Sequence, residues 1–182
     1  YELKTNPLLE EEQQKGNLFV FNNVMTLFCR TSESVRNMFS TNCCGKGEKW
    51  EDYPAFPSIF KKSGYSVLFW DNQYIPVSNQ NCDYSLNSYL FSKKISNKTY
   101  DMVRAHVSNY DGDLISDYKS YVDNHKPAYP LLSIFHLQGQ HFDAQNHYPL
   151  AHRIYNAEDV KRTDSYLTND MKEAIAHYDN CT

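Results

Sequence analysis

The sequence lacks the features that mark membrane spans, secretory leaders and nucleic-acid-binding proteins. No apolar stretch approaches the roughly 18 residues of a membrane-spanning helix. The N-terminal residues show no basic region followed by an apolar core and a small-residue cleavage site. The 18 Lys and Arg residues are outnumbered by 22 Asp and Glu residues, the net charge is −4, and no basic run stands out. This charge balance argues against nucleic acid as a partner.

Cys-x-x-Cys pairs are also absent, which disfavours a structural zinc knuckle. The odd number of cysteines leaves at least one thiol unpaired within the chain. The sequence permits a disulfide from Cys29 to Cys43 or Cys44 but does not establish one. The cysteines alone do not identify the cellular compartment. The five cysteines are Cys29, Cys43, Cys44, Cys82 and Cys181.

What is present is the composition of a globular domain. The 182 residues suffice for one domain with a core, and hydrophobic residues make up 41% against 22% charged. Aromatic residues reach 15%, dominated by 15 Tyr. We expect many of the tyrosine rings to be packed in the protein while their hydroxyl groups contact solvent. The chain starts at Tyr1 without Met, so we expect a fragment of a longer protein, with any anchor or signal upstream.

Apolar runs alternate with segments of helical spacing, and this alternation predicts the fold class. The predicted buried strands are 18–26, 65–70 and 129–137. The predicted helices are 5–16, 31–40, 55–64, 111–125 and 163–180. Loops are expected at 42–53, 71–98 and about 138–156. Because the strands are apolar throughout, we predict an α/β domain whose mainly parallel sheet is covered on both faces.

Residues on the inner faces of three predicted helices are expected to contact the core. They are Val35, Met38 and Phe39 in the second helix, Leu114, Ile115, Tyr118 and Val122 in the fourth, and Tyr166, Met171, Ile175 and Tyr178 in the last.

Three polar clusters follow predicted strands: residues 31–34, 71–73 and 136–141. Ligands of parallel α/β sheets gather beyond the carboxyl ends of the strands. We therefore expect the three clusters to converge at one edge of the sheet.

Thr31 stands at a strand-to-helix turn and has two interpretations. It can be an ordinary helix cap, with its hydroxyl accepting a backbone N–H and Glu33 favouring the positive helix end. It can also be a nucleophile, because a helix N-terminus stabilises both an alkoxide and an incoming phosphate. A threonine nucleophile needs activation, and a divalent metal would lower the pKa of its hydroxyl. Ser32 and Ser34 are less favoured, because Thr31 comes first at the turn.

Two histidines follow the third predicted strand and form a candidate site. His136 and His141 are separated by Gly139, which permits a tight backbone. Histidine commonly serves as a metal ligand or proton carrier, although a single histidine is usually an ordinary core or surface residue. His147 and His152 are interpreted as solvated loop residues.

The remaining polar motifs have plain structural interpretations. Asp71, Asn72 and Gln73 can position a ligand, but a turn in which Asp71 or Asn72 bonds its own backbone is favoured. Asp113 is expected to cap a helix, since the segment lacks the further acidic ligands of a calcium loop. The acidic run Glu10–Glu12 is expected to be a solvated helix face.

Seven motifs follow one another along the chain: NNVMT, RTSESVRNMFS, FPSIFKKSGYSVLFWDNQ, YDGDLISDYKSYV, LLSIFHLQGQHFD, HYP and HYDN. Their order and spacing resemble the periplasmic catalytic domain of bacterial phosphoethanolamine transferases, in the alkaline phosphatase and sulfatase superfamily. The resemblance covers the chain from about residue 1 to its C-terminus. Its most specific elements are Thr31 upstream of Met-Phe-Ser and the His136-x-x-Gly-x-His141 pattern.

The resemblance implies a three-layer αβα sandwich and zinc-dependent transfer of phosphoethanolamine from a phospholipid to a glycan acceptor, typically lipid A. Thr31 aligns with the nucleophile, which binds zinc and becomes phosphorylated by the head group. His136 and His141 align with histidines that bind substrate phosphate or a second zinc ion. Members are inner-membrane proteins with this domain in the periplasm.

The family pattern extends beyond both ends of this sequence. Its first acidic metal ligand is expected before Tyr1, and its later Asp-His pair and a further His beyond Thr182. Residues 1–182 are thus expected to be one partial catalytic domain, with weak metal affinity and no useful catalysis alone.

Three alternatives are weighed against the transferase. They are a glycerol phosphate transferase that also uses a threonine nucleophile, a sulfatase-like hydrolase, and a non-catalytic glycan- or protein-binding domain. A true sulfatase needs Cys or Ser in Cys-x-Pro-x-Arg, and CRTSE lacks the Pro and the Arg.

Overall fold

The computed structural model describes residues 3–26, 28–29, 31–41, 53–73, 99–105, 108–141, 143–161 and 166–181. The chain divides into two compact units. The first consists of Tyr1–Val24, Asn109–Asp113 and Gln138–Thr182, and the second of Met25–Ser108 and Leu114–Leu137. The expected loop at 42–53 and most of the irregular segment 71–98 lie outside the described residues.

In the described part of the second unit three strands form a parallel sheet, which confirms the predicted sheet type. The strands are β1 (Ser66–Asp71), β2 (Met102–Ala105) and β3 (Leu131–His136), in the order β2-β1-β3. β1 pairs with β2 from Leu68↔Met102 to Asp71↔Ala105, and with β3 from Ser66↔Leu131 to Asp71↔His136. The central strand is buried along nearly its whole length, as expected for a parallel strand covered on both faces.

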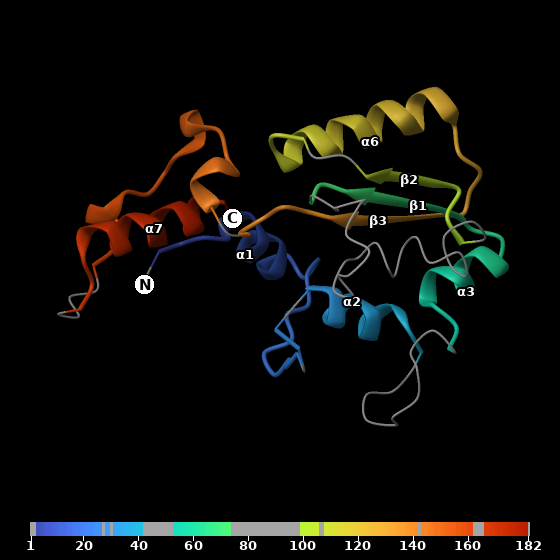
Figure 1. Cartoon of the computed structure of the whole chain (residues 1–182), viewed down its shortest axis with the longest axis horizontal. Coiled ribbons are helices and arrows are strands. Elements are labelled where there is room, and N and C mark those ends of the chain that lie inside the picture. Colours follow the sequence, from blue (N-terminus) through green and yellow to red (C-terminus); the bar gives the residue numbers. More distant parts are fainter. Residues whose placement is uncertain are drawn as a thin grey trace, which may run out of the picture. The chain divides into compact units, whose positions relative to one another are not determined.

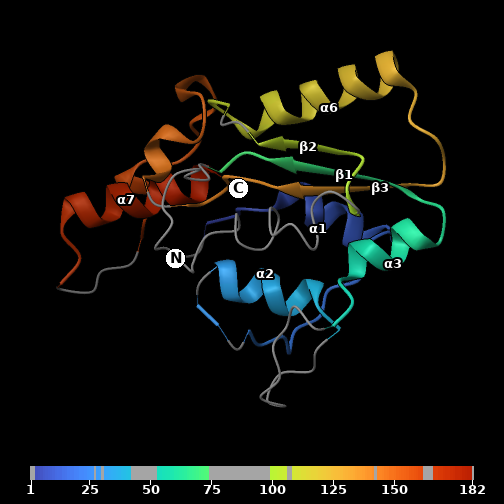
Figure 2. The same cartoon turned by 45° about the vertical axis from the view of Figure 1, so that its right-hand side comes forward.

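Helices cover the two faces of this sheet, which gives the predicted αβα layering (Figure 1). The helix α6 (Asp111–His125) lies over one face, where Leu114 packs against Leu68 and Trp70. The helices α2 (Thr31–Phe39) and α3 (Phe56–Lys62) lie on the opposite face, and the turned view in Figure 2 shows the same arrangement. Val35 of α2 packs there with Phe69. Alternate residues of β1 therefore supply the two halves of the core.

One strand predicted from the sequence is wrong, and one strand of the sheet was not predicted. Residues 18–26 form no strand, and Phe19, Phe21 and Met25 are 82–90% exposed. No described residue pairs with this segment, and an apolar run forms a strand only where a neighbour satisfies its backbone groups. Conversely, the sheet contains β2, a strand that the sequence analysis did not assign.

The described residues of the first unit include two complete helices, the start of α6 and several short 3₁₀ turns. The complete helices are α1 (Pro7–Gln14) and α7 (Asn169–Asn180), and the turns are η2 (Ala144–Asn146), η3 (Leu150–His152) and η4 (Ala157–Asp159). Thr168 caps α7 by accepting a hydrogen bond from the Met171 N–H at 3.2 Å. The helix is shorter than predicted because it begins at this cap.

Two of the predicted core lists need correction. Tyr166, Met171 and Tyr178 are exposed, and the buried residue of α7 is Ala176. Met38 of α2 is exposed as well, whereas Val35 and Phe39 belong to the core as expected. No helix in the described ranges has the length and apolarity needed to cross a bilayer.

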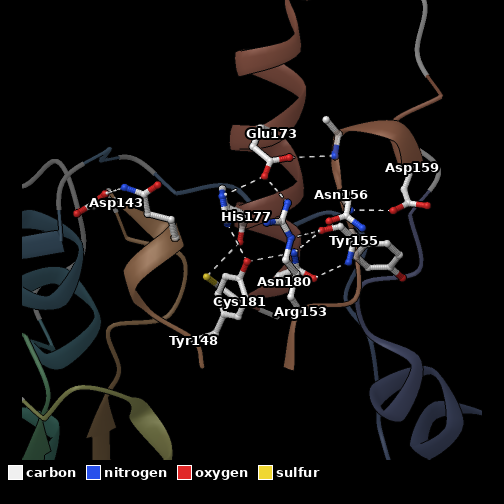
Figure 3. Close-up of polar contacts among 12 residues, drawn as sticks. Asp143, Tyr148, Arg153, Tyr155, Asn156, Asp159, Glu173, His177, Asn180 and Cys181 are labelled. Atoms are coloured by element: carbon white, nitrogen blue, oxygen red, sulfur yellow. Dashed lines mark hydrogen bonds and ion pairs between the residues drawn. The ribbon is translucent and has the colours of Figure 1, made fainter. Parts of the chain in front are cut away.

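A polar network ties α7 to the turns of the first unit (Figure 3). The Asn180 side-chain oxygen accepts hydrogen bonds from the N–H groups of Ile154 and Tyr155, both at 2.8 Å, and its nitrogen donates to the Tyr155 carbonyl at 2.8 Å. Glu173 forms an ion pair with Arg153 and accepts a hydrogen bond from the Ala157 N–H at 3.1 Å. These contacts hold an irregular segment against the helix.

We expect the ion pair between Glu173 and Arg153 to lose its contribution to stability in acid. The hydrogen bond with Arg153, aided by the Ala157 N–H and the nearby His177, lowers the pKa of Glu173 below its ordinary value. Because the folded pKa is depressed, the contribution to stability is present above the unfolded pKa of about 4.3 and is lost as pH falls through the folded pKa. We expect Glu173→Gln to weaken this pH dependence, measured by urea unfolding between neutral and acidic pH. An unchanged pH dependence would contradict this expectation. Glu158→Gln, in an exposed acid of the same unit, is the control.

Candidate functional site

The site begins where β1 and β3 end side by side. Asp71 and His136 are the last residues of their strands and are partners in the parallel register. The Nδ1 atom of His136 lies 2.7 Å from Oδ1 of Asp71, a short contact typical of a charge-assisted hydrogen bond. Asp71 is fully buried, and the His136 side chain is 15% exposed. Two of the three polar clusters predicted at this edge thus meet.

The two residues after Asp71 also contact the end of β3. The Asn72 N–H donates to the His136 carbonyl at 2.9 Å, and the Gln73 side-chain amide donates to the Leu137 carbonyl at 2.9 Å. The Gln73 N–H donates to Asp71 Oδ1 at 3.1 Å, which is the turn contact that the sequence favoured. The Asp-Asn-Gln segment is therefore a turn, and it also fixes the backbone and ring of His136.

One carboxylate oxygen of this cluster has no hydrogen-bond partner among the described residues. The Oδ2 atom of Asp71 is buried, and no described residue hydrogen-bonds to it. The main-chain oxygen of Asp71 lies 3.4 Å from the guanidinium of Arg104, which also binds Asp117 and Ser108, each at 2.6 Å. Arg104 supports the end of β1 from the neighbouring strand β2, a role that the sequence analysis did not assign.

Thr31 is the first residue of α2. This position at the start of the helix agrees with both interpretations of Thr31, the cap and the nucleophile, and both stay predictions. The side chains of Thr31, Ser32 and Glu33 lie outside the described residues, and the convergence of Thr31 with the strand ends stays a prediction. The Ser34 hydroxyl donates to the Phe28 carbonyl at 3.2 Å, so it serves the entry to the helix.

The other histidines belong to the first unit. His141 is exposed, and its N–H donates to the Gln138 carbonyl. His147 is not a solvated loop residue, because its ring lies 3.1 Å from both the Gly139 carbonyl and the Gln138 amide. His152 is exposed, as expected. A cavity of about 290 Å³ lies in this unit, lined by Tyr110, Asp111, Gly112, Asp113, Gly139, His147, Tyr148, Pro149, His152 and Cys181.

The carboxylates at this cavity serve the start of α6. Asp111 accepts hydrogen bonds from the N–H groups of Gln138 and Gly139 at 2.9 and 2.8 Å. Asp113 accepts one from the Tyr110 N–H at 3.2 Å, and it is the third residue of α6, so it lies inside the helix and not at the cap position that was predicted. Burial, and to a lesser degree the charge of Asp111, raise the pKa of the Cys181 thiol. Cys29 is an exposed free thiol, and Cys43 and Cys44 lie outside the described residues.

A bound zinc ion needs several His, Cys, Asp or Glu side chains around one point. No group of three or more His, Cys, Asp or Glu residues among the described side chains is placed to hold a metal ion. These residues therefore supply no ligand set for the zinc that the family resemblance implies, and the expectation that Thr31 binds zinc stays a prediction.

A family comparison identifies the group of proteins to which this sequence is related. The model of the sulfatase family matches residues 1–182, the whole sequence. The chain belongs to the sulfatase family. No curated protein matches it.

Solved structures show that this sulfatase-family chain shares a known fold. It is similar to the C-terminal periplasmic domain of EcEptC from Escherichia coli, with a TM-score of 0.79 at 22% sequence identity. The same domain in its complex with Zn gives a TM-score of 0.72 at the same identity. Both matches cover 100% of this chain and 49% of the other, so the chain spans about half the length of that domain.

Proposed function

We propose that the protein transfers phosphoethanolamine from a phospholipid to a glycan acceptor such as lipid A, with Thr31 as the nucleophile. The observation that carries the proposal is the position of Thr31 as the first residue of α2, in a sulfatase-family chain with the fold of the EcEptC periplasmic domain. The N-terminus of a helix favours negative charge, both on an alkoxide and on a phosphate oxygen.

In the proposed reaction the Thr31 oxygen attacks the phosphorus of the lipid. A new O–P bond forms, the bond from phosphorus to the diacylglycerol oxygen breaks, and diacylglycerol leaves with a proton. An acceptor hydroxyl then attacks the phosphothreonine, receives the phosphoethanolamine group and returns the proton to Thr31. Two displacements through a covalent intermediate replace one difficult step.

His136 is proposed to bind the phosphate of the donor. Its Nδ1 is held by Asp71, and in the doubly protonated ring the Nε2–H donates a hydrogen bond to a phosphate oxygen. His141, an exposed residue, is proposed as a second phosphate-binding histidine. The proposed setting is the periplasmic face of the inner membrane, in keeping with the periplasmic domain of EcEptC.

The proposal is tested by following the head group. The full natural protein is incubated with vesicles of phosphatidylethanolamine, labelled in the ethanolamine, and with lipid A. We expect label in lipid A, equimolar release of diacylglycerol, and a labelled peptide containing Thr31 when lipid A is omitted.

The same assay separates the alternatives. Release of free phosphoethanolamine with no labelled glycan would indicate a hydrolase of the same family. Turnover of phosphatidylglycerol alone would indicate a glycerol phosphate transferase. Lipid A binding with neither donor turned over would indicate a non-catalytic domain.

A further inference from the structure

We infer that Asp71 is a positioning residue for His136, and that it sets which ring nitrogen faces the substrate. The inference rests on the proposed function, because His136 is taken as the residue that meets the donor phosphate. It gives a role to the Asp-Asn-Gln turn that follows β1, for which a turn bonded to its own backbone was the favoured interpretation.

The contact between Asp71 and His136 determines where the ring proton lies. An ionised carboxylate only accepts hydrogen bonds, so a distance of 2.7 Å from Asp71 Oδ1 to His136 Nδ1 places the proton on Nδ1. Nε2 is then the nitrogen left for the donor phosphate, to which it donates a hydrogen bond when it also carries a proton. A carboxylate bonded to the far nitrogen of a histidine fixes its tautomer and the orientation of its ring.

The carboxylate itself is held rigidly. Asp71 is the last residue of the buried strand β1, and it is the register partner of His136. Asn72 binds the His136 carbonyl, and its own side-chain oxygen accepts a hydrogen bond from the Ser108 N–H at 2.7 Å. The ring and backbone of His136 are thus held by neighbouring residues of one turn, which leaves the imidazole little freedom to rotate.

Burial of the Asp71 carboxylate has a cost in folding free energy. A buried carboxylate with one oxygen unpartnered among the described residues is costly to the folded state. A neutral residue of the same shape would avoid much of this cost. Stabilisation of the fold therefore does not explain why a carboxylate occupies the position of Asp71, whereas its contact with His136 does.

A double-mutant cycle in the full natural protein tests the inference. The variants are Asp71→Asn, His136→Gln and the pair, assayed by labelled phosphoethanolamine transfer to lipid A. We expect Asp71→Asn to lower kcat/KM for the donor about tenfold to a hundredfold, with little change in thermal midpoint. In the His136→Gln background the same substitution should cause no further loss. A full additional loss there, or an unchanged kcat/KM in the single variant, would overturn the inference.

Asp101→Asn is the matched control. The Asp101 carboxylate also contacts β1, since it accepts a hydrogen bond from the Val67 N–H at 2.8 Å, but it lies near the other end of that strand. It also forms an ion pair with Lys61. We expect this variant to lower the thermal midpoint and leave kcat/KM unchanged, which is the pattern of a structural carboxylate.

A second readout separates this inference from the proposed function. Nitrogen-15 NMR of the labelled histidine ring reports which nitrogen carries the proton. We expect His136 to be protonated at Nδ1 in the natural protein and in Asp101→Asn, and to lose this preference in Asp71→Asn. A protein with this signature but without transferase activity would contradict the proposed function and support the positioning role. Protonation at Nε2 alone would overturn the positioning role whatever the activity.

Discussion

Replacing Thr31 with alanine is expected to abolish head-group transfer, with kcat lowered about a thousandfold or more. The substitution removes the one oxygen that the proposed mechanism makes covalent, so no phosphothreonine can form. The measurement is the transfer of labelled phosphoethanolamine in the full natural protein. The labelled peptide seen without acceptor should disappear in the same variant.

The fold should survive this change, because α2 is anchored elsewhere. Val35 lies in the core with Ala55 and Phe69, and Phe39 packs against the same cluster. Alanine is also the best helix former. The experiment therefore decides between the two interpretations of Thr31. If its hydroxyl were only a cap, Thr31→Ala would cost about 1 kcal/mol of stability and leave transfer intact.

Two neighbouring variants complete this test. Thr31→Ser keeps a hydroxyl at the first position of α2 and should retain measurable transfer, whereas Ser32→Ala should be close to the natural protein. Substantial activity in Thr31→Ala, or loss of activity in Ser32→Ala with Thr31→Ala active, would contradict the choice of Thr31.

Long or strongly patterned segments could be predicted from the sequence. The helix predicted over 111–125 is α6, with the same bounds. The apolar runs at 65–70 and 129–137 contain β1 and β3 within one or two residues. In these segments hydrophobic spacing and flanking turn residues indicate the same structure.

Segments whose structure depends on distant residues could not be predicted. β2 has only four residues, and one of them is Arg104, whose charge breaks the apolar pattern. Its guanidinium binds Asp117 and Ser108, and this pairing is not visible in the local sequence. Residues 18–26 show the opposite error, since their apolar side chains are exposed and no described strand pairs with them.

The candidate site shows the same limit at the level of single residues. Strand order and the apolar runs placed Asp71 and His136 at one edge of the sheet. Their direct contact depends on the register of β1 and β3, in which the two residues are partners. A shift of one residue would turn the side chain to the opposite face. The sequence therefore predicted the neighbourhood of the two residues but not their bond.

The largest loss of stability from a single substitution is expected for Trp70→Ala, at about 3–5 kcal/mol. Trp70 is 2% exposed and lies in the core between β1 and α6. Its ring makes edge contacts with Tyr118 and Tyr121 at centroid distances of 5.5 and 5.6 Å, and stacks on Phe135 at 6.4 Å. Alanine would leave a cavity among three aromatic rings, measured as a lower free energy of unfolding in urea.

Trp70→Phe separates the contribution of ring packing to stability from the contribution of the indole N–H. The indole Nε1 is buried and has no hydrogen-bond partner among the described residues. Phenylalanine removes this unsatisfied donor and keeps an aromatic ring, so the two effects offset each other and the expected loss is about 1 kcal/mol or less. Tyr129→Ala, at a side chain 76% exposed, serves as the surface control and should change stability by less than about 0.5 kcal/mol. If Trp70→Phe cost as much as Trp70→Ala, the indole N–H would have a partner, and the packing of β1 against α6 would not be the main source of the loss.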